Sequence, residues 1–174
     1  TGGMGTGHVA PDTVALCDVD EGHLANARKR VTQGEPFMTR DFRRVLERKD
    51  VDAVIIATPD HWHALMTVMA CQAGKHVMSE KPTAKTIAEG RAMVNAARKY
   101  NRVVQIHAQG RSNPNAYLAC RFVRNGGIGR VRRVDVWHPV NFSTTSWGEE
   151  ERVPPELDWD MWLGPLRWMP YHHE

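Results

Sequence analysis

A continuous apolar run, Ala53-Val54-Ile55-Ile56-Ala57, narrows the possible folds of this chain more than any other segment does. A run without polar alternation is typical of a parallel β-strand that is covered on both faces. Residues 51–57 are therefore predicted to form such a strand, and Pro59 should end it because proline has no N–H for the sheet ladder. A parallel strand needs partner strands joined by helical crossovers, which the rest of the chain should supply.

Strand-like and helix-like segments alternate on both sides of this run. The other strand-like segments cover residues 13–17, 75–79 and 103–107. Residues typical of helix ends flank the segments between them: Asp20, Asp41 and Asp60 as N-caps, Thr86 with Glu89 as a capping box, Gly74 as a stop, and Asn113 with Pro114 as a start. This order predicts an α/β fold with a Rossmann-type, doubly wound parallel sheet.

The pattern changes after Gly127. Residues 131–137 alternate in part and no strong helix follows them, which predicts the first strand of another sheet with one face open to water. Residues 157–165 are aromatic and bounded by glycine and proline. They could pack across another domain or a partner.

Composition excludes several classes of partner. The chain has 174 residues, 41% hydrophobic and 25% charged, and its net charge of +3 comes without a basic cluster. We therefore expect no nucleic-acid partner and no membrane partner. No apolar run is nearly as long as a membrane-spanning segment, which needs about 18 residues. Three distant cysteines without a CxxC pair predict reduced thiols rather than a disulfide or zinc site: Cys17, Cys71 and Cys120.

The chain begins in a glycine cluster, Gly2-Gly3-Met4-Gly5, that is typical of a dinucleotide turn. Such a turn lets the backbone approach a pyrophosphate at a helix N-terminus. The cluster supplies the last four positions of G-x-G-x-x-G, so the leading glycine and its strand would lie upstream of Thr1. A flexible, tag-like N-terminus is the alternative.

The segment that follows is too short for its predicted role. Residues 6–12 include Pro11 and would span only about 10 Å as a helix, less than a five-residue strand of about 16 Å. We therefore expect residues to be absent around positions 8–10. Otherwise the segment is not a working nucleotide turn.

Asp18 ends the second strand-like run. At this position in a dinucleotide fold, a carboxylate can accept both hydroxyls of the adenosine ribose. It would repel a 2′-phosphate, which favours NAD over NADP. A helix cap is the alternative role, although Asp20 is better placed for it.

Glu80, Lys81 and Pro82 follow the strand predicted over residues 75–79. Ligands of open α/β sheets sit outside the carboxyl ends of the strands. Lys81 is therefore expected to point its amine into a crevice, and a surface lysine beside a turn is the alternative. Thr58 lies at the same edge after the preceding strand.

His61 and His63 lie in the first turn of the next predicted helix. The His-x-His spacing could suggest a metal, but two such side chains point in different directions and no third ligand is nearby. We predict no metal here. One histidine is expected to face a cofactor and the other to lie on the surface.

Together these stretches resemble the Gfo/Idh/MocA family of NAD(P)-dependent oxidoreductases. The matching stretches are residues 2–5, 14–20 and 56–63, and above all Ser79-Glu80-Lys81-Pro82. Ile128-Gly129 and residues 157–165 also resemble this family's entry into its second domain. The resemblance covers nearly the whole chain; Glu-Lys-Pro with the upstream Thr-Pro-x-x-x-His is fairly specific, whereas the glycines alone are not.

The resemblance implies two domains. The first is a Rossmann domain over residues 1–127 that lacks its first strand and most of its first helix. The second is an incomplete substrate and oligomerisation domain over residues 128–174, the start of an α+β domain with a mostly antiparallel sheet. The implied activity is hydride transfer between NAD(P) and a sugar, inositol or related alcohol, in a cytoplasmic homo-oligomer (a dimer or tetramer).

The resemblance also implies roles for individual residues. Lys81 matches the catalytic lysine beside the nicotinamide and the substrate hydroxyl, where a positive nicotinamide and partial desolvation favour the neutral amine. The implied cofactor residues are Gly2, Gly3, Met4, Gly5, Asp18, Thr58, Pro59, His63 and Glu80. The residues expected to meet substrate are Lys81, Gln109 and Arg111. The family's later Asp and His, the second of which assists the lysine, have no match in this chain.

Three functions stay open at this point. The first is a sugar-type dehydrogenase or reductase that uses NAD. The second is a relative that uses NAD transiently to cleave glycosides by oxidation and elimination. The third is a non-catalytic NAD-binding or interaction module. Lys81 favours the first, but only weakly.

Overall fold

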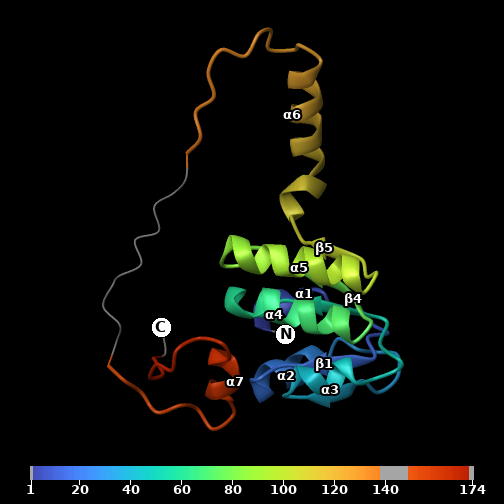
Figure 1. Cartoon of the computed structure of the whole chain (residues 1–174), viewed down its shortest axis with the longest axis vertical. Coiled ribbons are helices and arrows are strands. Elements are labelled where there is room, and N and C mark those ends of the chain that lie inside the picture. Colours follow the sequence, from blue (N-terminus) through green and yellow to red (C-terminus); the bar gives the residue numbers. More distant parts are fainter. Residues whose placement is uncertain (1, 138–148, 173–174) are drawn as a thin grey trace. The chain divides into compact units, whose positions relative to one another are not determined.

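The computed structural model describes residues 2–137 and 149–172, along which helices and strands alternate (Figure 1). In chain order the elements are α1 (Gly2–Gly7), β1 (Ala15–Cys17), α2 (Glu21–Arg28), β2 (Phe37–Thr39), α3 (Phe42–Leu46), β3 (Ala53–Ile56), α4 (Asp60–Gln72), β4 (His76–Ser79), α5 (Ile87–Lys99), β5 (Val104–Ile106), the 3-10 helix η1 (Gln109–Ser112), α6 (Pro114–Arg124) and α7 (Trp159–Leu163). The predicted α/β fold is confirmed.

The strands form two separate parallel sheets. In the first, β1 pairs with β2, and Leu16 lies opposite Met38. In the second, the order is β3-β4-β5, and Val77 of β4 lies between Val54 and Val104. The helices α4 and α5 return the chain between successive strands of this sheet, as parallel pairing requires.

The chain divides into two compact units. The first comprises residues 1–107 and 150–171, and the second comprises residues 108–149 and 172–174. The five strands belong to the first unit, whereas η1 and α6 belong to the second. The boundary at residue 127 stays a prediction, but residues 157–165 pack within the first unit.

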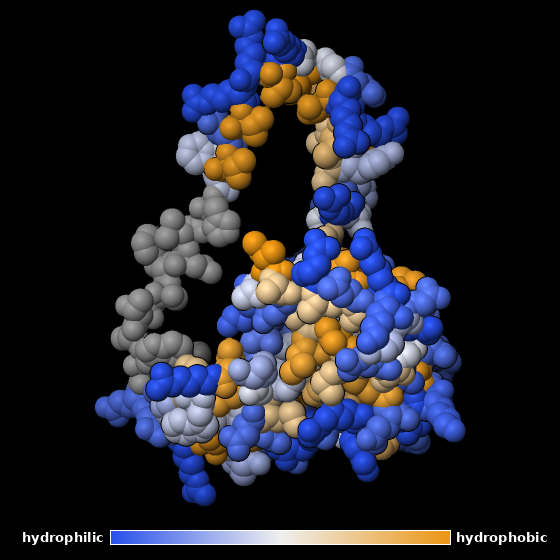
Figure 2. Space-filling view, in the orientation of Figure 1, coloured by the Kyte–Doolittle hydropathy of each residue, from blue (hydrophilic) through white to orange (hydrophobic). Residues whose placement is uncertain are grey.

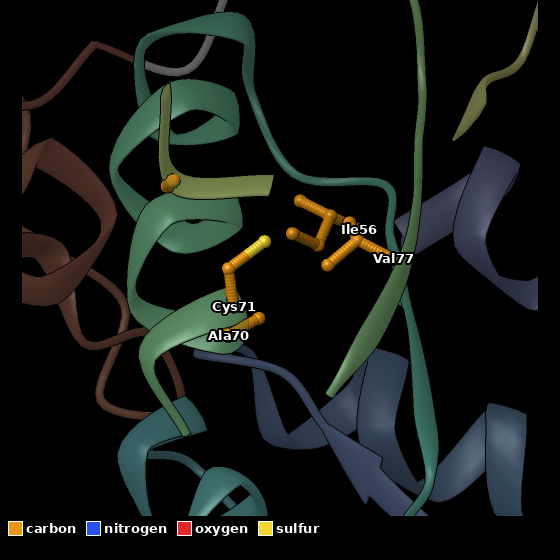
Figure 3. Packing of buried hydrophobic residues seen from close by; sticks show 5 residues of the cluster. Ile56, Ala70, Cys71 and Val77 are labelled. Carbon is orange, nitrogen blue, oxygen red and sulfur yellow. The ribbon is translucent and has the colours of Figure 1, made fainter. Parts of the chain in front are cut away.

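The three-stranded sheet buries an apolar cluster against two helices. Ile56 and Val77 of the strands pack against Ala70 and Cys71 of α4 and Ala96 of α5 (Figure 3). A second cluster packs α2 and the loop after it on β1: Leu16, Leu24, Ala27 and Val31. Cys17, Cys71 and Cys120 form no disulfide.

Most predicted helix ends are confirmed. Asp20 and Asp41 accept hydrogen bonds from the N–H groups of His23 and Arg43, and Asn113 accepts one from that of Asn115. Thr86 and Glu89 form the complete capping box of α5, and Gly74 follows α4 with φ 78°. These signals are local, which is why the sequence pattern suffices to find them.

The predicted N-cap at Asp60 is wrong. The helix α4 begins at Asp60 itself, its N-cap is Pro59, and no side chain caps it. The carboxylate of Asp60 instead lies in the first turn, where a negative charge favours the helix dipole.

The predicted strand over residues 131–137 is also wrong for the described part of the chain. These residues have no regular secondary structure and are exposed. A strand needs a ladder partner, and no described segment pairs with this one. Several large apolar side chains of the second unit are exposed: Leu118, Phe122, Ile128, Val134 and Val136. Figure 2 shows hydrophobic residues, in orange, at the surface of this unit.

Residues 157–165, called the aromatic tail below, pack on α4 within the first unit. The indole N–H of Trp62 donates to the carbonyl oxygens of Met161 (3.1 Å) and Trp162 (3.0 Å). Gly164 follows α7 with φ 50°, and a Cβ there would lie 2.0 Å from the Trp62 ring, so only glycine fits. No helix among residues 2–137 and 149–172 is both long and apolar enough to cross a membrane.

Candidate functional site

The carboxyl ends of β3, β4 and β5 meet at one edge of the sheet. The N–H of Glu80 donates to the Ile56 carbonyl at 2.8 Å, and the N–H of His107 donates to the Ser79 carbonyl at 2.8 Å. These bonds continue the parallel ladder past the strands, so the segments after them leave the sheet side by side. The structure therefore brings together Thr58, Glu80, Lys81 and His107, at the edge where α/β folds bind ligands.

Glu80 is the centre of this edge, although it is only 3% exposed. Its Oε1 lies 3.0 Å from His8 Nε2 and 2.5 Å from His107 Nδ1, and its Oε2 accepts from the Lys81 N–H at 3.2 Å. A carboxylate can only accept, so both facing imidazole nitrogens must carry the donated proton. The rings of His8 and His107 meet edge to face at 5.0 Å.

These contacts keep Glu80 ionised. Burial alone would raise the pKa of its carboxyl, but hydrogen bonds from His107, His8 and the Lys81 N–H lower it from 4.5 to about 2. The site therefore holds a buried negative charge beside Lys81. Its partners come from three separated parts of the chain.

The ligand atoms of His8, Glu80 and His107 lie within 4.8 Å of one another, a set that could hold a divalent ion. The hydrogen bonds to Glu80 already account for this arrangement, so we describe it as a hydrogen-bonded network. That the chain binds no metal stays a prediction.

His63 is 1% exposed and joins two of the strand-end loops. Its Nε2 lies 2.9 Å from the Thr58 carbonyl oxygen and its Nδ1 lies 2.6 Å from the Pro82 carbonyl oxygen. The Lys81–Pro82 peptide bond is cis. His63 thus fixes the backbone on both sides of the edge that carries Lys81.

His61 is not the surface residue that the sequence predicted. It is 7% exposed, and its Nε2 lies 2.8 Å from the Trp162 carbonyl oxygen. The aromatic tail covers it, a contact between residues 101 positions apart that local patterns cannot reveal. The two imidazoles therefore contact different carbonyl groups.

Replacing His63 by alanine is expected to destabilise the protein by roughly 2–4 kcal/mol. The change removes a fully buried side chain and leaves two carbonyl oxygens without their imidazole partner. Urea unfolding at neutral pH measures the effect, with His23→Ala, whose side chain is 55% exposed, as the matched control. Equal stabilities of the two variants would contradict this role of His63.

Lys81 is exposed, so the described residues do not form the predicted crevice around its amine. Glu80 and His63 instead fix the backbone on which Lys81 stands. Thr58 is more enclosed: its Oγ1 is buried and has no hydrogen-bond partner in the described structure. A buried hydroxyl without a partner at a ligand-binding edge fits a polar group of a bound cofactor.

Asp18 lies at the carboxyl end of β1, as predicted. Its side chain is 9% exposed, and its Oδ1 accepts the Asp20 N–H at 3.0 Å. Asp20 caps α2, so both aspartates lie at the positions predicted for them.

The glycine cluster lies within α1 rather than in a turn before a helix, since α1 begins at Gly2. Met4 is 49% exposed. Gln109 and Arg111 belong to η1 in the second unit, and both are exposed. The roles of these residues stay predictions.

The sequence pattern missed two residues of the site, His8 and His107. His107 follows β5, so the same rule that selected Thr58 and Lys81 could have found it. His8 lies 72 positions from Glu80, in a segment whose fold the sequence left open, and no local signal points to their contact.

Comparison with known proteins agrees with this geometry. Residues 4–108 match the family described as "Oxidoreductase family, NAD-binding Rossmann fold" (GFO_IDH_MocA). The levoglucosan dehydrogenase of Pseudarthrobacter phenanthrenivorans is 39% identical over 93 residues, which cover 53% of this chain and 24% of that protein. A glycosyl hydrolase family 109 protein of Saccharopolyspora erythraea is 34% identical over 125 residues, 67% of this chain and 27% of that protein.

Solved structures show the same likeness. A myo-inositol 2-dehydrogenase from Lactobacillus plantarum has a TM-score of 0.67 at 25% identity over 75% of this chain and 40% of that one. A levoglucosan dehydrogenase in complex with NADH and levoglucosan has a TM-score of 0.63 at 32% identity, over 74% of this chain and 38% of that one. The matches to the two curated relatives span less than a third of their lengths.

Proposed function

Because the chain belongs to the Gfo/Idh/MocA family of oxidoreductases, we propose that it transfers a hydride between NAD and a carbon of a sugar, inositol or related alcohol. The observation that carries the proposal is the position of Lys81. It follows β4 at the carboxyl edge of the sheet, next to the buried, ionised Glu80 and across from Thr58. Levoglucosan and inositol, named for two of its relatives, are the first substrates to test.

The residues divide into three roles in this proposal. Lys81 takes the proton of the substrate hydroxyl in the direction of oxidation and returns it in the direction of reduction. Thr58, Pro59, His63 and Glu80 shape the nicotinamide side, with the buried Oγ1 of Thr58 free to bond to the cofactor. Gly2, Gly3, Met4 and Gly5 lie toward the pyrophosphate, and Asp18 lies toward the ribose. NAD, when bound, supplies the hydride acceptor.

The test is the stoichiometry of the reaction with sugars and inositols as substrates. Formation of one NADH for each oxidised sugar supports the proposal. Release of a sugar from a glycoside without net NADH would contradict it and favour the second candidate, NAD-dependent glycoside cleavage, which the glycosyl hydrolase family 109 relatives suggest. NAD binding with neither reaction would identify a non-catalytic module.

Asp18 sets the expected choice of cofactor. We expect NAD to bind at least about tenfold more tightly than NADP, because a carboxylate repels a 2′-phosphate, and Asp18→Asn to reduce that ratio. Asparagine keeps an oxygen for the Asp20 N–H, so the local turn should persist. Calorimetric titration with both cofactors measures the ratio, and tighter binding of NADP by the unaltered protein would overturn the assignment.

We also propose a cytoplasmic homo-oligomer. Cysteines that form no disulfide fit a reducing compartment, and the exposed apolar side chains of the second unit fit an interface between copies. Sedimentation analysis of the purified protein tests the second point.

A further inference from the structure

We infer that the aromatic tail positions the carboxylate of Asp18 for the cofactor ribose, and that the affinity for NAD depends on the contacts that hold the tail in place. The inference rests on the proposed function, in which Asp18 lies toward the ribose. The tail contacts two segments that are far apart in the chain: the loop between β1 and α2, which begins at Asp18, and the first turn of α4 (Figure 1). All of these residues belong to the first unit.

The tail fixes the loop between β1 and α2 on both sides of Asp20. The Asp158 N–H donates to the Val19 carbonyl oxygen at 3.0 Å. The Glu21 N–H donates at 3.1 Å to the carbonyl oxygen of Glu156, the residue directly before the tail. Between these two bonds, Asp20 forms an antiparallel β-bridge with the tail. The backbone of residues 19–21 is therefore paired with the tail as one strand is with another.

This pairing determines where the carboxylate of Asp18 points. Its Oδ1 accepts the Asp20 N–H at 3.0 Å, and its side chain is only 9% exposed. The Asp20 N–H and the Val19 carbonyl belong to one planar peptide group, so the bond from Asp158 to that carbonyl fixes the donor of Asp18 as well. Hydrogen bonds from the two ribose hydroxyls weaken steeply when the acceptor turns away, so a displaced loop should bind NAD less tightly.

The tail is anchored on α4 by buried groups. The Trp162 carbonyl oxygen lies 2.8 Å from His61 Nε2 and accepts the Trp62 indole N–H at 3.0 Å. His61 and Trp62 are each 7% exposed, and such polar groups are costly to leave without a partner. The Trp162 N–H donates to the Asp158 carbonyl oxygen at 2.9 Å, so one turn of α7 joins the contact on α4 to the contact on the loop.

Trp62→Phe tests the inference, because it removes the indole N–H that bonds the tail and keeps an aromatic ring in place. We expect this variant to bind NAD about tenfold more weakly in calorimetric titration, and amide exchange at Glu21 and Asp158 to become faster. Trp159→Phe is the matched control, since the indole N–H of Trp159 donates at 2.9 Å to the Met169 carbonyl oxygen and not to the loop or α4. It should leave the affinity within about twofold.

A double-mutant cycle shows whether the effect acts through Asp18. In an Asp18→Ala background there is no carboxylate to position, so Trp62→Phe should change the NAD affinity by less than about twofold. Gly164→Ala provides a second way to displace the tail, because its Cβ would lie 2.0 Å from the Trp62 ring. It should weaken NAD binding in the unaltered background and not in the Asp18→Ala background.

The outcomes separate this inference from the proposed function. Unchanged NAD affinity of Trp62→Phe and Gly164→Ala would overturn the inference and leave the proposed function intact. An equal loss of affinity with and without Asp18 would also overturn it, because the tail would then act on the fold in general. If the unaltered protein bound no NAD, the proposed function would fail together with the inference.

Discussion

Lys81→Met is expected to lower kcat by about 10²–10⁴-fold, the usual contribution of a positioned acid or base. The Michaelis constant for NAD should change only a few-fold, because in the proposed reaction the lysine acts on the proton of the substrate hydroxyl. Methionine is unbranched and only one atom shorter than lysine, and Lys81 is exposed, so the fold should not change. Steady-state kinetics with the oxidised sugar and NADH both quantified measure the effect.

Lys85→Met is the matched control, since Lys85 is exposed in the same loop. It should retain the activity of the unaltered protein. If Lys81→Met turns over within a few-fold of that activity, Lys81 is not catalytic. The hydrogen bonds of Glu80 and His63, which fix the backbone at Lys81, would then have to serve another chemical group.

Glu80→Gln is expected to destabilise the protein at neutral pH by about 2–3 kcal/mol, because a buried acceptor charge shared by two imidazoles is lost. The direction of the pKa shift of Glu80 determines how this stabilisation depends on pH. The folded-state pKa of Glu80, about 2, lies below its ordinary 4.5, so its stabilisation is present above about pH 4.5 and disappears as the pH falls toward 2.

Urea unfolding from pH 7 down to pH 2 should therefore show the difference between the two proteins shrinking below about pH 4.5. Glu150→Gln, at an exposed carboxylate, is the control and should follow the unaltered protein throughout. A difference that stays constant between pH 5 and 2 would show that the Glu80 carboxylate is not stabilised by its charge.

The sequence predicted the parts of this protein whose signals are local. The apolar run of residues 53–57 and the capping box of Thr86 and Glu89 each act within a few residues, and both predictions are confirmed. The placement of Thr58, Glu80 and Lys81 at one edge follows from the rule that parallel strands share their carboxyl ends.

The parts that the sequence could not predict depend on distant contacts. Glu80 meets His8 across 72 positions and Trp62 meets Trp162 across 100, and neither partner has a local signature. The strand expected over residues 131–137 failed for a related reason. Its alternating pattern describes a face for burial, but a strand forms only when a partner strand is present.

The most direct measurement follows a deuterium atom from a substrate labelled on its carbons. Hydride transfer predicts that the label leaves the carbinol carbon and appears in NADH, with one labelled NADH for each oxidised product. A protein that cleaves glycosides by transient oxidation would instead return the label to the released sugar and leave no net NADH. Finding the label in the sugar, or no transfer under conditions where NAD binds, would contradict the proposed oxidoreductase activity.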